Sequence, residues 1–273
     1  MRCLYVDLDG TLLGAGGALI LDGDREVSLL GLRAVEACIR AGAEVVLMSG
    51  RRQAGVAELA RLLGQSSYIF EAGSAVVLDG EEHWLTGPWR PGARTIHDQI
   101  DDTGAPALLL ERYAGRLEYY EPWHRNREVS HLFRGLVDAF EADALLAEHG
   151  HDGLRLVDNG GAQRRSAALA ELAQVRVYHL VPEGSSKANA VAAHMRMRGY
   201  GPDDCIAVGD SREDLGVAAH VGAFWLVANA IAKDPTITEA VAAQDGRVRI
   251  AEAGHGAGVY EAVVTTLAER RGG

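Results

Sequence analysis

The chain has 273 residues, of which 48% are hydrophobic and 24% charged, the balance of a globular protein with one large domain or two modest ones. It holds no apolar run of the roughly 18 residues that a membrane helix needs, and its start carries no apolar signal region. The net charge of −11 argues against a nucleic-acid partner, because nucleic acids bind a basic face. We therefore expect a cytoplasmic protein, monomeric or homodimeric, with no nucleic-acid and no membrane partner.

The first 81 residues predict alternating strands and helices. Apolar runs of strand length lie at 2–6, 44–48 and 67–70, and helical periodicity covers 28–41 and about 52–63. Short loops between strands and helices are typical of a parallel sheet with helices on its faces.

The middle of the chain predicts a different arrangement. Residues 75–78 and 82–85 flank Asp79-Gly80, a pair that is favoured in tight hairpin turns. Beyond them the pattern predicts two units of one helix and two strands each. The elements are a helix near 91–100, strands at 107–112 and 116–120, a long helix at 129–149, and strands at 154–157 and 175–180. This pattern predicts an antiparallel α+β unit.

The alternation of strands and helices resumes after Pro182. The expected elements are a helix at 187–198, a strand at 205–208, a short helix at 215–219, strands at 223–227 and 248–250, and a closing helix at 258–270. The sequence therefore predicts an α/β, Rossmann-like domain formed by residues 1–81 and 183–273. An α+β domain at 82–182 is inserted into it.

Two acidic motifs follow predicted strands of the α/β domain. Asp7-Leu8-Asp9-Gly10-Thr11 ends the first strand, and Asp210 and Asp214 lie in the Gly209-Asp210-Ser211-Arg212-Glu213-Asp214 segment that follows the strand at 205–208. Alone, the first motif is also explained by a solvated acidic turn. Because ligands of open parallel sheets bind beyond the carboxyl ends of the strands, the two motifs together predict that Asp7, Asp210 and Asp214 converge on Mg²⁺, directly or through water.

Two further segments supply groups that hold phosphate. Ser49-Gly50 ends the second predicted strand and offers a hydroxyl and a backbone N–H. Lys187 opens a predicted helix after Ser185 and Ser186, either of which is a candidate helix cap. It is one of only two lysines among 27 basic residues, the other being Lys233. A compact ammonium at Lys187 can neutralise a phosphoryl group, whereas arginine would present a wide planar fork.

In this order the motifs resemble those of haloacid dehalogenase (HAD) superfamily phosphatases. The resemblance covers 1–81 and 183–273, with Asp7-Leu8-Asp9-Gly10-Thr11, Ser49, Lys187 and Gly209-Asp210-Ser211-Arg212-Glu213-Asp214-Leu215 as the four family motifs. It implies that Asp7 is the nucleophile and forms an aspartyl-phosphate, that Asp9 is the general acid and base, and that Ser49, Gly50 and Lys187 bind the phosphoryl group. It also implies that Asp7, the backbone carbonyl of Asp9, Asp210 and Asp214 hold Mg²⁺.

The position of the insert, between Ser49 and Lys187, is similar to that of the C2B cap of subfamily IIB, which includes Cof-like, sucrose and mannosyl-3-phosphoglycerate phosphatases. Glu71-Ala72-Gly73 and Arg212-Glu213 depart from the pattern that is common there. The resemblance implies a Mg²⁺-dependent phosphatase of small phosphorylated metabolites, of the sugar phosphate or phosphoglycerate type. Two alternatives stay open, a phosphomutase and a catalytically silent HAD-like binding module.

Substrate recognition is expected from polar residues in the loops of the insert. The candidates are Arg112, His124, Arg125, Asn126, Arg127, Asn159, Arg164 and Arg165. Of these we single out Arg112, Asn159, Arg164 and Arg165, because arginine forks suit a second anionic group and Asn159 precedes two glycines that let a ligand approach the backbone. Solvated surface is the alternative explanation for each of them.

Overall fold

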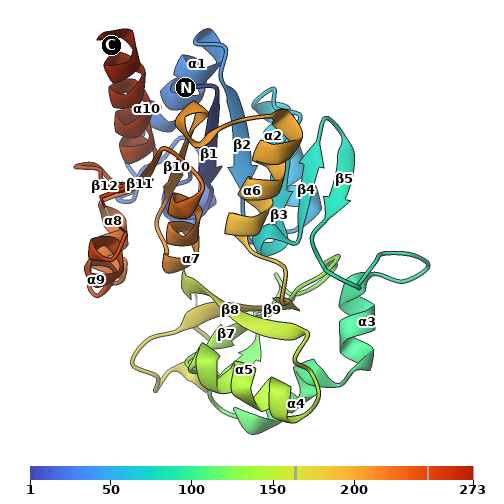
Figure 1. The fold of residues 1–273 in the computed structure, drawn as a ribbon. Helices are drawn as coiled ribbons and strands as arrows, with labels where there is room; N and C mark the ends of the chain where they lie inside the picture. The colour runs from blue at the N-terminus through green and yellow to red at the C-terminus, as the bar shows by residue number, and fades with distance from the viewer. Residues whose placement is uncertain (163–164, 245, 273) are drawn as a thin grey trace.

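The computed structural model describes residues 1–162, 165–244 and 246–272. It contains two sheets (Figure 1). The large sheet has eight strands in the order β12-β11-β10-β1-β2-β3-β4-β5. Their bounds are β1 Cys3–Asp7, β2 Glu44–Met48, β3 Tyr68–Phe70, β4 Ala75–Leu78, β5 Glu81–Trp84, β10 Cys205–Gly209, β11 Ala223–Leu226 and β12 Val248–Ile250. All neighbours pair in parallel except β3 with β4 and β4 with β5.

Helices cover both faces of the large sheet, because its central strands are apolar on both sides. In β1, Leu4 and Val6 pack into one buried cluster, and Cys3 and Tyr5 pack into the other. The first cluster is completed by α1 Leu30–Arg40, α2 Gln53–Leu62 and α10 His255–Gly272. The second is completed by α6 Lys187–Arg198, α7 Arg212–Leu215, α8 Asn229–Lys233 and α9 Ile237–Ala242. This layering confirms the predicted α/β fold with a mostly parallel sheet.

The small sheet is antiparallel and has the order β6-β7-β9-β8. Its strands are β6 Leu117–Tyr119, β7 His131–Gly135, β8 Leu154–Gly161 and β9 Arg176–Pro182, and its helices are α3 Ile96–Asp102, α4 Ala105–Arg112 and α5 Ala139–Glu148. We call this unit, α3–α5 with β6–β9, the cap. Helices α4 and α5 lie on the side of the small sheet that faces away from the large sheet (Figure 1). The opposite side of the small sheet therefore faces the carboxyl ends of the large sheet's strands.

Two predicted elements of the cap are wrong. The segment 107–112 is not a strand but part of α4, which begins after Gly104 (φ +79°) and has Pro106 in its first turn. A short apolar run fits a buried strand or a helix equally well, and the proline at a helix start is the signal that decides between them. The predicted helix at 129–149 is in fact β7 followed by α5. Asp138 caps α5 by accepting hydrogen bonds from the N–H groups of Phe140 and Glu141.

The predicted order of two helix-strand-strand units is nevertheless present. The first unit is α3–α4 with β6 and β7, and the second is α5 with β8 and β9. The predicted boundary at 81/82 falls within β5, and the one at 182/183 coincides with the end of β9. That these boundaries divide the chain into a catalytic and a substrate-selecting domain remains a proposal. Within the described residues, no helix is long and apolar enough to cross a membrane.

Candidate active site

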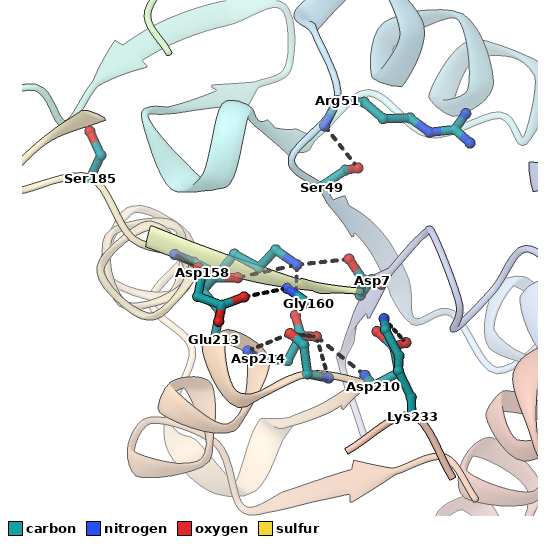
Figure 2. Close-up of polar contacts among 12 residues, drawn as sticks. Asp7, Ser49, Arg51, Asp158, Gly160, Ser185, Asp210, Glu213, Asp214 and Lys233 are labelled. Atoms are coloured by element: carbon teal, nitrogen blue, oxygen red, sulfur yellow. Dashed lines mark hydrogen bonds and ion pairs between the residues drawn. The ribbon is translucent and has the colours of Figure 1, made fainter. Parts of the chain in front are cut away.

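The acidic motifs meet where neighbouring strands of the large sheet end. Strand β1 pairs in parallel with β10, so Asp7 and Asp210 emerge at the same edge. Asp214 follows one turn later, in α7. All three are at most 5% exposed, and one carboxylate oxygen of each lies within 4.8 Å of the others (Figure 2). The close approach requires glycine at position 10, where a Cβ would lie 2.3 Å from Asp210 Oδ2.

Asp214 organises this edge through both of its oxygens. Oδ2 accepts hydrogen bonds from the backbone N–H groups of Asp210 and Ser211, at 3.2 and 3.1 Å, and from the Ser211 hydroxyl at 2.6 Å. Ser211 is the N-cap of α7, so Asp214 and Ser211 cap each other. Oδ1 accepts a hydrogen bond from Lys187 Nζ at 2.7 Å. The loop after β10 is thereby fixed against the helix that carries Lys187.

Lys187 is the buried cation of the site. It is 1% exposed, and its Nζ donates to Asp7 Oδ1 and Asp214 Oδ1, each at 2.7 Å, and lies 3.2 Å from Glu213 Oε2. It opens α6, which is capped by Ser186, one of the two candidates. Glu213 also accepts the backbone N–H of Lys187 at 2.9 Å. The sequence reasoning noted Glu213 only as a departure from the family pattern, but the structure gives it a direct contact with Lys187.

Asp9 lies apart from the three clustered carboxylates. Its two oxygens accept hydrogen bonds from Arg51 Nε and Nη2, at 2.7 and 2.6 Å. Both side chains of this bidentate pair are partly exposed, at 36% for Arg51 and 41% for Asp9. Sequence reasoning did not single out Arg51. Its place immediately after Ser49-Gly50, on the loop next to the Asp7 motif, was the available signal.

The Ser49-Gly50 loop lies between the large sheet and the cap. Ser49 is buried, and its hydroxyl accepts the backbone N–H of Arg51 at 3.1 Å (Figure 2). A Cβ on Gly50 would lie 2.7 Å from His179 Nε2 and 2.9 Å from Asn159 Nδ2, both on cap strands. Arg127 of the cap donates a hydrogen bond to the Gly50 carbonyl. The cap therefore closes directly onto the predicted phosphate-binding loop.

The four selected cap residues differ in their surroundings. Asn159 of β8 reaches the Ser49-Gly50 loop, as just described. Arg112 is exposed at the end of α4, on the side of the small sheet that faces away from the large sheet (Figure 1). Arg165 donates to the carbonyls of Leu172 and Ala173 within the cap. Arg164 lies outside the described residues. Sequence reasoning missed His179, since a lone histidine in a strand carries no distinguishing signal.

Glu71 joins the large sheet to the cap. This fully buried carboxylate accepts the backbone N–H groups of Glu128, Val129 and Ser130, at 2.8, 3.0 and 2.7 Å. Arg127 Nε lies 3.7 Å from the same carboxylate. Glu71 precedes Gly73, where a Cβ would lie 2.1 Å from the backbone of Ser186. Residues 71–73 thus contact both the cap and Ser186, the N-terminal capping residue of α6.

The electrostatics of the site show an excess of negative charge. Burial raises the pKa of Asp7 well above its usual value; Lys187 opposes this shift, while Asp214 and Asp210 reinforce it. Burial likewise raises the pKa of Asp210 and of Glu213. Burial alone would lower the pKa of Lys187, but its carboxylate neighbours outweigh burial and raise it well above its usual value.

The donor set fits a divalent cation. Four carboxylates (Asp7, Asp210, Glu213 and Asp214) face two ammonium groups, because Lys233 Nζ lies 2.7 Å from Asp210 Oδ2. Two negative charges therefore lack a counter-charge among these groups, and burying them uncompensated is costly. The cluster of Asp7, Asp210 and Asp214 offers oxygen ligands without sulfur or imidazole, as Mg²⁺ prefers.

Comparison with solved structures shows which known fold this arrangement has. The structure is similar over 97% of the chain to a sucrose-phosphatase from Synechocystis (98% of that chain, TM-score 0.67, 17% identity). It is also similar over the whole chain to a sugar phosphatase described as HAD subclass IIB (99% of that chain, TM-score 0.59, 15% identity). The fold is that of HAD subclass IIB. This confirms the resemblance that the motifs indicated.

Sequence comparison finds similar proteins that are named phosphatases. A phosphoglycolate phosphatase from Methanoculleus marisnigri is 29% identical over 96% of this chain and 95% of its own length. Another, from Halorubrum lacusprofundi, is 28% identical over 83% of this chain and 84% of its own length. No protein-family model matches the sequence. The HAD fold thus spans the whole chain, with the cap included.

Proposed function

We propose that the protein is a Mg²⁺-dependent phosphoric monoester hydrolase that acts on a small phosphorylated metabolite through an aspartyl-phosphate on Asp7. The observation that carries the proposal is the buried Asp7 carboxylate, held by Lys187 at the strand ends beside Asp210 and Asp214. The names of the relatives support it, since they are phosphoglycolate phosphatases. The substrate classes we propose are phosphorylated short acids and sugar phosphates.

In this proposal an oxygen of Asp7 attacks the phosphorus, and the leaving-group oxygen takes a proton from Asp9. Asp9 then removes a proton from the water that hydrolyses the aspartyl-phosphate. Lys187 and the Ser49-Gly50 loop bind the phosphoryl oxygens, and Asp7, Asp210, Asp214 and the backbone carbonyl of Asp9 would hold Mg²⁺. When bound, Mg²⁺ supplies the positive charge that lets an anionic nucleophile approach an anionic phosphate.

The proposed role of Asp9 requires it to leave Arg51. Partly exposed ion pairs contribute only about 0–1 kcal/mol, so exchanging Arg51 for a substrate oxygen costs little. Lys187 and Asp214, by contrast, are buried and already joined by a hydrogen bond of 2.7 Å. Asp9 is therefore the proposed catalytic carboxylate that has to exchange its partner before the reaction.

The test is a phosphatase screen with Mg²⁺ over phosphorylated short acids, sugar phosphates and p-nitrophenyl phosphate. We expect phosphate release from at least one small monoester. We also expect the Asp7→Asn variant to lose at least about 1000-fold in kcat, because its amide cannot form the phosphoenzyme. An Asp7→Asn variant that hydrolyses at the parent rate would refute the nucleophile. Release of phosphate by none of the esters, with turnover only when a bisphosphate activator is added, would indicate a mutase instead.

A further inference from the structure

Both lysines of this arginine-rich chain touch the acidic cluster. Lys187 contacts Asp7 and Asp214, and Lys233, the last residue of α8, donates to Asp210 Oδ2 at 2.7 Å. The proposed reaction assigns no task to Lys233. Its place is also sterically restricted, because a Cβ on Gly160 of the cap would lie 3.1 Å from Lys233 Nζ. A compact ammonium, rather than a guanidinium, fits between Asp210 and the cap strand (Figure 2).

Lys233 lines a small pocket between the large-sheet domain and the cap. The pocket is lined by Asp158 and Gly160 of β8, Arg176 of β9, and Asp210, Arg212 and Lys233 of the large-sheet domain. Each basic residue in it has one acidic partner. Arg176 donates to Asp158 at 2.5 Å, Arg212 to Asp234 at 2.7 Å, and Lys233 to Asp210. The pocket is thus lined by paired charges, and one of the pairs uses a carboxylate of the proposed Mg²⁺ site.

The three ion pairs differ in what Mg²⁺ does to them. Asp158 and Asp234 lie outside the cluster of Asp7, Asp210 and Asp214, so the two arginines keep their partners when the cation binds. Asp210 belongs to that cluster, and a divalent cation bound to its carboxylate competes with the ammonium for the same negative charge. Of the three basic residues that line the pocket in the described part of the chain, Lys233 is then the one whose positive charge its acidic partner no longer balances. Its side chain is 30% exposed and lines the pocket.

We propose that Lys233 binds a second anionic group, a carboxylate, on the leaving-group side of the substrate. The inference rests on the proposed phosphatase function. The spacing limits the ligand to a short one, since Lys233 contacts Asp210 and an oxygen of Asp210 lies within 4.8 Å of one on Asp7. The phosphorus and the carboxylate must then be only a few bonds apart. This favours a short phosphorylated hydroxy acid over an uncharged sugar phosphate.

The kinetic test compares two substrates that differ only in this group, 2-phosphoglycolate and 2-hydroxyethyl phosphate, with saturating Mg²⁺. Replacing Lys233 by Met, and separately by Gln, should lower the ratio of kcat/KM for phosphoglycolate over hydroxyethyl phosphate by at least about 10-fold, mainly through KM. This is the scale of one lost charge-assisted hydrogen bond. Arg61→Met, which removes one exposed positive charge on α2, should leave the ratio unchanged. An equal fall for both substrates would overturn the proposal and leave Lys233 only as the counter-charge of Asp210.

A binding test separates this proposal from the proposed function. In the Asp7→Asn background with Mg²⁺, calorimetry measures the dissociation constants of phosphoglycolate and of inorganic phosphate without turnover. Adding Lys233→Met should weaken phosphoglycolate at least about 10-fold more than phosphate. Equal weakening of both ligands would refute the carboxylate site. If the parent protein hydrolyses no ester but the calorimetric difference holds, the phosphatase function fails and the Lys233 site stands.

Discussion

Each end of the large sheet holds a compact cluster of potential metal ligands, but the pKa values of the carboxylates shift in opposite directions at the two ends. Each end holds three potential metal ligands with one atom apiece within 4.8 Å of one another. At the carboxyl end these are Asp7, Asp210 and Asp214, and at the amino end they are Cys3, Glu44 and His194. Distance alone does not distinguish the two clusters. Ligand type and the balance of charge around each of them do.

At the amino end, Glu44 and His194 both have polar partners within the protein. Glu44 accepts hydrogen bonds from Arg198 at 2.9 Å and from Tyr200 at 3.1 Å, and His194 Nδ1 lies 2.8 Å from the Tyr5 hydroxyl. Burial alone would raise the pKa of Glu44, but the neighbouring polar groups of His194, Arg198 and Ser67 outweigh burial and lower this pKa to about 2. Ionised Glu44 is therefore stabilised by the fold, as expected of a structural carboxylate.

At the carboxyl end the pKa values of Asp7 and Asp210 move in the opposite direction, upward. Burial destabilises their ionised forms there, and a bound cation would offset this cost. The direction of the pKa shift thus distinguishes the carboxyl end, where a bound cation would stabilise the carboxylates, from the amino end, where protein groups already stabilise Glu44.

Metal removal should have the largest effect. With EDTA in excess, activity towards the best ester of the screen should fall at least about 100-fold and return when Mg²⁺ is added. Mg²⁺ should also raise the melting temperature, since a ligand at 100 times its Kd adds about 2.7 kcal/mol to stability. Activity that is unchanged by EDTA would contradict the assignment of the carboxyl end as a Mg²⁺ site.

Replacing one carboxylate at each end by its amide should affect the free energy of unfolding of the metal-free protein differently at the two ends. Glu44→Gln should lower the free energy of unfolding by about 1–3 kcal/mol, because it removes a partly buried carboxylate from its cationic and hydroxyl partners. Asp210→Asn should leave that free energy unchanged or raise it, because it relieves repulsion from Asp7 and Asp214. Urea unfolding at pH 7 with EDTA measures both. A similar loss of unfolding free energy in both variants would contradict the proposed difference between the two ends.

The pH dependence of these variants should differ in sign. Glu44 has a pKa of about 2 in the folded state and an ordinary value of 4.5, so its stabilising contribution is complete above pH 4.5 and disappears as pH falls towards 2. The gap between the parent and Glu44→Gln should therefore narrow below pH 4.5. The carboxyl of Asp210 has a raised pKa, so its unfavourable contribution grows as pH rises from the acid range. The gap between Asp210→Asn and the parent should widen in that direction. Urea titrations from pH 7 to pH 3.5 follow both gaps.

The large sheet and the approach of Asp7 to Asp210 were predictable, because buried strands end where these two motifs begin and parallel strands align their carboxyl ends. Lys187 follows no strand of the large sheet, and only the resemblance to the family motifs indicated its place. The types of the cap elements were not, since the short apolar run at 107–112 fits either a strand or a helix until Pro106 is weighed. Long-range pairs such as Lys233 with Asp210 leave no local periodicity. Only the rarity of lysine marked Lys233.

The smallest effect should come from the pair of Arg51 and Asp9, whose two side chains are both partly exposed. Arg51→Met should change the free energy of unfolding by no more than about 1 kcal/mol, because both side chains are more than one-third exposed and water screens their attraction. Urea unfolding beside Glu44→Gln tests this, and a larger loss than that of Glu44→Gln would contradict it. A small loss would mean that the exposed pair with Arg51 contributes little to stability and leaves Asp9 free to exchange partners. That freedom is what a carboxylate needs if it is to give up and regain a proton during turnover.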